Sequence, residues 1–407
     1  MKPISTLLVS ASLFGATALS AYADGHAVEM HVIMCGDEVF PADVAVIEAF
    51  DAERDDVTVN LEPVPWGNCQ DKSLTLAAAG DPPSLAYMGS RTLRQLASNG
   101  LIDPVQMSDE RKASFQPGVL RTVTMDGETW GRPHAFSTKA LYMNCDLIEA
   151  AGASCDAPAT WEDLRSLAQT VVDNTDAAGI GLAGKDFDNT MHQFLNYLYS
   201  NGGEVVAEDG SVALDSQNTR EALEFYASLV SVAQEGVLEW ERDAMVDLFN
   251  DGQIAMYING PWGWGRHNEE INQKVVPVPA GPSGESGTLL ITDSLVVFKG
   301  TGHEDIASEL AEALTTGDAQ YTLDKEWGLT PILQYEKLGV SDLFYEAAPE
   351  HWQHFISSIP GGGPEPLITD FKSLQAVFVN MIQGAILEEE SIDDLVAIAA
   401  EELEDAL

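Results

Sequence analysis

Histidines and carboxylates are the residues of this chain whose types and spacing could support metal chemistry. His351 and His354 lie three residues apart and could offer two metal ligands, although two histidines on a helix surface fit the same pattern. Asp186, Asp188 and Asn189 contain part of a calcium-loop pattern, but the remaining ligand positions of that pattern are missing. These residues therefore predict no metal site.

Patterns typical of catalysis are also incomplete. The segment 281–288 is rich in glycine and serine like a phosphate loop, but it lacks the lysine and the required spacing. The nucleophile pattern Gly-x-Ser-x-Gly does not occur. Carboxylates are so numerous that a pair of them says nothing about glycoside hydrolysis. We expect no catalytic residue and no cofactor.

Tryptophans beside glycine and proline are the more informative residues. Trp262 and Trp264 lie in the sequence Gly-Pro-Trp-Gly-Trp-Gly at 260–265, Trp66 precedes a glycine after a predicted strand, and Trp327 also precedes a glycine. Burial in a core is the usual fate of a tryptophan, but turns at strand ends can aim side chains into a cleft. An indole there offers a flat apolar face to a sugar ring. Polar neighbours could bind hydroxyls: Asn68, Ser90, Arg91 and Thr330.

The strands and helices that must position these residues follow one another along the chain. Apolar residues alternate with polar ones at 28–34 and 57–61, as on strands, and recur with helical spacing at 44–50. Thr160, with Asp163 three residues later, predicts a helix start. Further segments are predicted as helices at 72–79, 219–233 and 371–407, and as strands at 85–88, 254–258 and 289–298. Alternating strands and helices predict an α/β fold with mainly parallel sheets.

The N-terminus has the features of an export signal. Lys2 precedes an apolar and small-residue stretch at 7–20, and Ala21-Tyr22-Ala23 offers small residues to a signal peptidase. The stretch is too short for a comfortable membrane span. We expect residues 1–23 to be cleaved, with no cysteine at the cut for a lipid anchor, and the mature protein to be periplasmic.

Four cysteines agree with export to an oxidising compartment. Cys35, Cys69, Cys145 and Cys155 can pair in three ways. The pairing Cys35–Cys69 with Cys145–Cys155 is favoured, because each bond then joins neighbours within one predicted lobe. A zinc site would need a clustered spacing that is absent.

Charge excludes some partners. The 407 residues contain 65 acidic and 20 basic side chains, spread along the chain. Such a surface repels phosphate backbones and anionic lipids, so nucleic acid and membrane surfaces are poor partners. An apolar fraction of 45% indicates a folded protein.

Three segments resemble a known family, the extracellular solute-binding proteins of carbohydrate ABC importers of the maltose-binding type. Residues 80–91 (Gly-Asp-Pro-Pro-Ser-Leu-Ala-Tyr-Met-Gly-Ser-Arg) are similar to its third-strand segment, with Ser84 in place of an aspartate. Residues 131–144 resemble the first crossing between lobes, where Met143 and Cys145 replace a tyrosine and a lysine. Residues 255–263 (Ala-Met-Tyr-Ile-Asn-Gly-Pro-Trp-Gly) are the most specific match.

The resemblance implies a two-lobed periplasmic binding protein fold. Each lobe would be a mainly parallel sheet flanked by helices, and several strands would cross between the lobes. One lobe would contain residues 24–136 and 292–333, and the other residues 140–288 and 337–407. Ligand would bind in the cleft, and the lobes would close on it by a hinge motion.

The resemblance also implies site residues. Trp262 corresponds to a tryptophan that stacks on sugar, and Ser90 and Arg91 to a pair that binds hydroxyls, with serine replacing the usual acid. Ser137 corresponds to a crossing position that often carries an acid. Asp37 follows the first strand, where the family aims a polar side chain into the cleft. Further candidates are Trp66, Asn68, His192, Trp264, Trp327 and Thr330.

The leading hypothesis is a monomeric, non-enzymatic receptor that delivers a mono- or disaccharide to the permease subunits of an importer. The same fold could instead bind a polyol or an anionic relative such as a glycerol phosphate or sulfosugar, with Arg91, Arg132 and Arg266 as candidate partners of the anion. An extracellular glycoside hydrolase is a more remote alternative, which would need two carboxylates across one cleft.

Overall fold

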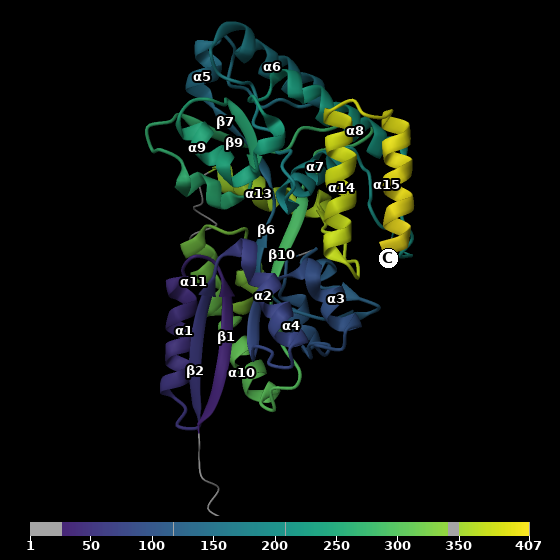
Figure 1. Cartoon of the computed structure of the whole chain (residues 1–407). Coiled ribbons are helices and arrows are strands. Elements are labelled where there is room, and N and C mark those ends of the chain that lie inside the picture. The colour runs from purple at the N-terminus through teal and green to yellow at the C-terminus, as the bar shows by residue number, and fades with distance from the viewer. Residues whose placement is uncertain (1–26, 117, 208, 341–349, 407) are drawn as a thin grey trace, which may run out of the picture.

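A computed structural model describes residues 27–340 and 350–406, with residues 117 and 208 excepted. Two lobes lie one above the other in Figure 1, and strands β6 (Arg132–Ser137) and β10 (Leu289–Val297) run between them. The two-lobed α/β architecture predicted from the sequence is confirmed. The predicted signal peptide lies outside the described residues, and the exact limits of the two lobes stay a prediction.

The N-terminal lobe is built on a mixed sheet in the strand order β11-β10-β3-β1-β2, with β6 also paired to β10. Strand β1 (Val28–Cys35) pairs in parallel with β2 (Val57–Val64) and β3 (Leu85–Gly89). Strand β10 runs antiparallel to both β3 and β6. The short strands β4 (Thr124–Met125) and β5 (Glu128–Thr129) form a separate antiparallel pair. Strand β11 (Gly363–Pro364) pairs with Leu289 and Leu290 at the start of β10, where that strand enters the C-terminal lobe.

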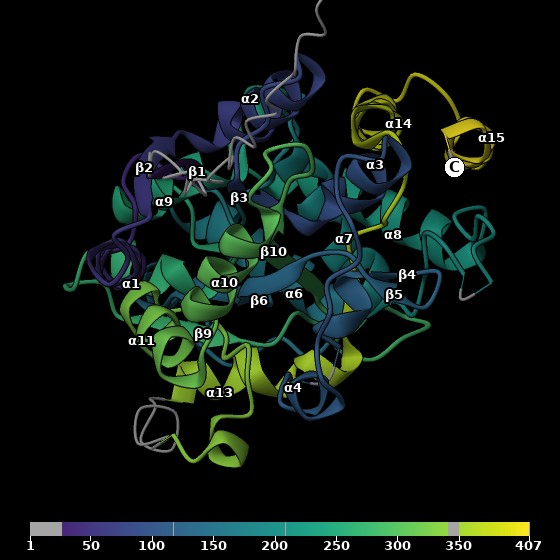
Figure 2. The ribbon, with the colours of Figure 1, turned by 90° about the horizontal axis from the view of Figure 1, so that it is seen from below.

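Helices cover both faces of this sheet, as Figure 2 shows, with α1, α10 and α11 on one side and α2 and α3 on the other. Apolar side chains between these layers form one buried core that includes Val32, Leu85, Leu295 and Leu310. The helices are α1 (Pro41–Ala52), α2 (Trp66–Ala78), α3 (Leu93–Ser98), α4 (Asp109–Ala113), α10 (Glu304–Leu314) and α11 (Gly317–Trp327). Helix α2 ends as predicted, before Gly80 in the left-handed region with a φ of 80°.

The C-terminal lobe corrects the prediction of a mainly parallel sheet. Its strands β7 (Ala140–Asn144), β8 (Met256–Asn259) and β9 (Gln273–Val276) form an antiparallel sheet in the order β8-β7-β9. Parallel pairing extends it only through isolated bridges, such as Gly181 with Tyr257. Alternating strands and helices did not fix the strand direction, because long chain segments separate β7 from both of its neighbours.

Helices make up most of the C-terminal lobe. Helix α7 (Asp188–Ser200) is buried along nearly its whole length and packs against α8 and α14. The predicted helical tail is a pair of helices, α14 (Phe371–Ile386) and α15 (Ile392–Ala406). The remaining helices are α5 (Cys145–Ala150), α6 (Trp161–Asn174), α8 (Gln217–Ser228), α9 (Met245–Asn250) and α13 (Glu350–Ser357). Among the described residues, no helix is both long and apolar enough to cross a bilayer.

Two crossings connect the lobes through their cores. Leu289 and Ile291 at the start of β10 belong to the core of the C-terminal lobe, whereas Leu295 further along belongs to the core of the N-terminal lobe. The chain makes the same passage from Ala135 on β6 to Leu141 on β7. Strands β6 and β10 pair with each other where they cross, so the connection is a two-stranded ribbon.

Both favoured disulfides are present. Cys35 bonds to Cys69 in the N-terminal lobe, and Cys145 bonds to Cys155 in the C-terminal lobe. This confirms the predicted pairing.

The predicted start of α6 gives a test of local stability. Thr160 Oγ1 accepts a hydrogen bond from the Asp163 amide, and the Asp163 carboxylate accepts one from the Thr160 amide. Replacing Thr160→Ala should lower the free energy of unfolding in urea by about 1 kcal/mol, since a capping side chain is lost. Thr170→Ala, within the same helix, is the control and should be nearly neutral. Equal losses in both variants would contradict a role for the cap.

Candidate functional site

A cavity of about 650 Å³ is lined by residues of both lobes. The N-terminal lobe contributes α2, α11 and the turn at Ser90–Thr92, and the C-terminal lobe contributes α7, α14 and the turn at Pro261–Arg266. Strands β6 and β10 add residues at the crossing. The cavity therefore lies where a change in the angle between the lobes would open or close it.

Six of the eleven predicted binding residues line this cavity. They come from six separate elements and from both lobes: Trp66, Arg91, Ser137, His192, Trp262 and Trp327. The fold thus brings together residues that are distant in sequence.

Two of the other five predicted residues are exposed to solvent. Asp37 lies in the bend after β1. Asn68 lies on α2, but on a different face from Trp66 and Gln70, which line the cavity. Placing Trp66 and Asn68 in one turn was wrong, because the helix starts at Trp66 and sends the two side chains in different directions.

The remaining three predicted residues are engaged with neighbouring protein groups. Ser90 Oγ lies 2.9 Å from Ser294 Oγ, and Thr330 Oγ1 accepts a hydrogen bond of 3.2 Å from the Thr138 amide. Trp264 stacks on His351, with ring centroids 3.7 Å apart. Ser90, Thr330 and Trp264 are therefore not among the residues that line the cavity.

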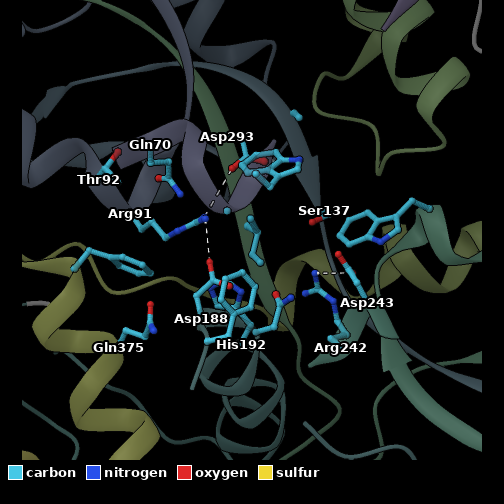
Figure 3. A pocket seen from close by; sticks show the side chains of 18 of the residues that line it. Gln70, Arg91, Thr92, Ser137, Asp188, His192, Arg242, Asp243, Asp293 and Gln375 are labelled. Carbon is cyan, nitrogen blue, oxygen red and sulfur yellow. Dashed lines mark hydrogen bonds and ion pairs between the residues drawn. The ribbon is translucent and has the colours of Figure 1, made fainter. Parts of the chain in front are cut away.

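Arg91 is the centre of a buried charge cluster. Its Nη2 donates to Asp188 Oδ2 at 3.2 Å, and its Nη1 lies 3.6 Å from Glu365 and 3.9 Å from Asp293. Figure 3 shows the guanidinium between Asp293 and Asp188, which reach it from β10 and α7. His192 Nε2 donates to the other oxygen of Glu365 at 2.5 Å. Each of these side chains is at most 15% exposed.

The two buried carboxyls respond to this environment in opposite ways. Burial raises the pKa of Asp293 to about 6, because Arg91 only partly compensates for the lost hydration and Glu365 opposes ionisation. Burial alone would also raise the pKa of Glu365, but the charges of Arg91 and His192 outweigh it and hold that pKa at about 2. Glu365 is therefore a fixed anion near neutral pH.

Aromatic rings form the wall of the cavity on the N-terminal lobe. Trp66 meets the edge of Tyr87 with ring centroids 5.5 Å apart, and Trp327 stacks on Phe40 at 3.7 Å. The Tyr87 hydroxyl donates to Asp293 at 3.1 Å, so the wall and the charge cluster are joined.

Trp262 forms the facing wall together with cations. Lys139 Nζ lies 4.7 Å and the Arg242 guanidinium 5.4 Å from its ring centroid. Lys139 also donates to Ser137 Oγ at 2.8 Å, and Arg242 lies 3.4 Å from Asp243. Burial, followed by the nearby charge of Arg242, lowers the pKa of Lys139 well below its ordinary value.

Sequence reasoning missed several residues of this cavity. Asp188 was considered only as part of a calcium loop, and Gln70, Asp293 and Arg242 were not considered. Glu365, which contacts Arg91 from behind the lining residues, was not considered either. A helical period starting from Trp66 would have predicted Gln70. No local signal marks Asp293 or Glu365, because long stretches of chain separate both from Arg91: Asp293 reaches it through the pairing of β10 with β3, opposite Gly89, and Glu365 through the segment before α14.

The cavity combines flat apolar faces with many hydrogen-bonding groups, an arrangement that suits a small polyhydroxylated molecule. In the described part of the chain, no three His, Cys, Asp or Glu side chains group in a way that could hold a metal ion.

Asp293 leads to a prediction about stability and pH. Its pKa in the folded protein lies above the ordinary 3.8, so the native state binds the proton more tightly than the unfolded chain, and the wild type loses stability as the pH rises through this range. The Asp293→Asn variant lacks this titrating group. As the pH rises from about 4 to about 7, the difference in unfolding free energy between the variant and the wild type should therefore shift by about 2 kcal/mol in favour of the variant. Urea titrations of both proteins measure this difference. Parallel pH profiles would contradict it.

Comparison with known proteins agrees with this architecture. A family model described as bacterial extracellular solute-binding protein matches residues 37–321. A putative binding protein of Brucella abortus is 28% identical over 391 residues, which cover 94% of each chain.

Two solved structures share the fold. One is an ABC transporter solute-binding protein of Thermotoga lettingae bound with α-D-tagatose, with a TM-score of 0.80 and 24% identity over 93% of this chain and 99% of that one. The other is maltose-bound MalE3 of T. maritima, also with a TM-score of 0.80 and 24% identity, over 93% of this chain and 100% of that one. Because the family model spans most of the chain, this protein belongs to the bacterial extracellular solute-binding proteins.

Proposed function

We propose that this protein captures a neutral sugar, a mono- or disaccharide, in the cavity between its lobes and delivers it to the permease subunits of an ABC importer. The observation that carries the proposal is the cavity itself, where Trp66 and Trp327 of one lobe and Trp262 of the other surround buried polar groups. Indoles cover the C–H faces of a sugar ring, while carboxylates and a guanidinium bind its hydroxyls.

The solved structures that share the fold support a sugar ligand, since their ligands are tagatose and maltose. Their low sequence identity leaves the choice of sugar to the residues of this cavity.

Capture would occur by closure of the lobes. The crossing ribbon is fixed at its ends, where the Lys139 amide donates to Thr288 Oγ1 at 2.7 Å and Thr288 Oγ1 donates back to the Lys139 carbonyl at 3.0 Å. Rotation about such a ribbon changes the distance between Trp262 and the aromatic wall, and opening would release the contact that Trp262 makes with the core of the N-terminal lobe. Closure around a ligand would then remove the sugar from water.

Export completes the proposed function. We infer that residues 1–23 are a cleaved signal peptide and that the mature protein is a free periplasmic monomer. The two disulfides support this location, because such bonds persist in an oxidising compartment.

A neutral ligand is favoured over an anionic one by the state of the arginines. Arg91 is already surrounded by Asp188, Asp293 and Glu365, so it has little positive charge to offer an anion. Of the other two arginines considered for an anion, Arg132 does not line the cavity as described, whereas Arg266 lines it and is exposed.

Salt dependence separates these two classes of ligand. Calorimetry against neutral sugars, polyols, sugar phosphates and sulfosugars identifies the ligand, and its dissociation constant is then measured in different salt concentrations. For a neutral ligand the constant should change by less than about twofold between about 50 mM and about 500 mM NaCl, because no net charge is neutralised. A steep loss of affinity would instead favour an anion, and no binding to any of these compounds would contradict the proposal.

Two tryptophans in one turn give a matched test of the site. Trp262→Ala should weaken sugar binding by roughly 1–3 kcal/mol, since stacking area is lost from the cavity wall. Trp264→Ala should leave the affinity nearly unchanged, because this ring stacks on His351 outside the cavity. Isothermal calorimetry on both variants gives the comparison, and the reverse order of effects would remove Trp262 from the site.

We also propose that the protein binds its ligand without chemical turnover. Incubation with chromogenic glycosides should release no product, and release that depends on the protein would favour a hydrolase.

A further inference from the structure

Helix α2 forms much of the cavity wall on the N-terminal lobe, yet it is held to that lobe by small side chains. Trp66, Gln70 and Leu74 follow one another at a spacing of four residues and line the cavity. The fully buried side chains of the helix, on another face, are Cys69, Ser73 and Ala77. None of these three is large, so they bury little apolar area.

Two other helices of the molecule, α10 and α14, show what a stronger anchor looks like. Helix α10 buries Leu310 and Leu314 in the same lobe, and α14 buries Phe371, Leu374 and Phe378 in the other lobe. Helix α2 has only the partly buried Trp66, Leu74 and Leu76 as large apolar contacts with the core. Its first residue follows Pro65, which provides no side-chain cap.

The disulfide supplies the missing attachment. Cys35 is the last residue of β1, at the end of the sheet next to the cavity, and Cys69 is in the first turn of α2. Their Cα atoms are 5.4 Å apart, and the two residues are 4% and 0% exposed. The bond therefore fixes the start of α2, where Trp66 and Gln70 project into the cavity, to the central strand of the lobe.

The position of α2 decides how two parts of the site meet. The Trp66 ring contacts Tyr87, whose hydroxyl donates to Asp293. Gln70 and Arg91 approach each other over Gly89, where an added Cβ would lie 3.0 Å from Gln70 Oε1 and closer still to the Arg91 guanidinium. A small shift of α2 would thus disturb both the aromatic wall and the charge cluster.

The second disulfide has no such position. Cys145 and Cys155 connect α5 to the segment that follows it in the C-terminal lobe, and no residue between them lines the cavity. It is a matched control within the same chain.

We propose that Cys35 and Cys69 are positioning residues of the ligand site: their disulfide holds α2 in the orientation that tight binding requires. The reduced chain, as it exists before export, is then a weak binder that becomes competent when the bond forms outside the cytoplasm. The effect on sugar binding rests on the proposed function, but the attachment of α2 can be tested without a ligand.

The test compares two double variants with the wild type, Cys35→Ala/Cys69→Ala and Cys145→Ala/Cys155→Ala. Amide hydrogen exchange, measured on the ligand-free proteins, should become faster in residues 66–78 of the first variant while residues 371–386 keep their rate. The second variant should leave the exchange rate of residues 66–78 unchanged.

Maltose and D-glucose then serve as probes in fluorescence titrations. A sugar that binds the wild type should bind the first variant roughly tenfold more weakly, because Trp66 and Gln70 must be ordered on binding.

Several outcomes would overturn the inference. Unchanged exchange in residues 66–78, or equal effects of the two double variants, would show that the bond contributes only general stability. Reduction of the wild-type protein with a phosphine is a second measurement that needs no variant. Because the phosphine also reduces Cys145–Cys155, the result is judged within the N-terminal lobe: faster exchange confined there to α2 supports a local attachment, whereas loss of protection across that whole lobe contradicts it. If neither sugar binds the wild type, these two sugars are not its ligands. The exchange data on the ligand-free proteins then still decide whether the disulfide holds α2.

Discussion

The interior of the site depends on one buried positive charge. Arg91 follows β3 in one lobe, and the carboxylates around it come from β10, from α7 and from the segment before α14. An isolated guanidinium would be too costly to bury, and removing one partner of a buried pair costs about 3–5 kcal/mol. The charge therefore requires all of these segments to meet at one place, and that place is the cavity between the lobes.

The three carboxylates around Arg91 differ in their lobe, their partners and their pKa. Asp188 belongs to the C-terminal lobe, so its contact with Arg91 crosses the cleft, and any opening of the lobes must break or stretch it. Glu365 is held between Arg91 and His192 and stays ionised, whereas Asp293 receives the Tyr87 hydroxyl and has a pKa of about 6. A neutral sugar can exchange hydrogen bonds with such a cluster without changing its net charge, but an added anion would meet three carboxylates around one guanidinium.

The sequence predicted the features that depend on local pattern and failed where the assembly of distant segments decides. The strand β1, the cap at Thr160, the stop at Gly80 and both disulfides follow from periodicity, side-chain chemistry and proximity in the chain. The antiparallel sheet of the C-terminal lobe does not, because strand direction depends on how long connections return.

The same division applies to the site. Trp262 and Arg91 were predicted from short motifs, yet Trp264, two residues from Trp262, turned out to stack on His351. Ser90 likewise is adjacent to Arg91 but hydrogen-bonds to Ser294 in the core. Neighbouring positions on a turn or helix point in different directions, so a motif can identify the right segment without telling which of its side chains faces the ligand.

The acidic surface and the cavity obey different constraints. Acidic side chains outnumber basic ones by 65 to 20 in the whole chain, yet Arg91 and Arg242 are buried at the cavity, whereas Arg266 and Lys372 line it from exposed positions. Charges on the surface are screened by salt and act on solubility, whereas buried charges must be balanced one by one. Net charge therefore predicts which macromolecules the protein avoids, whereas the ligand that we propose would be selected by hydrogen bonds to the balanced cluster around Arg91 and by the indoles beside it.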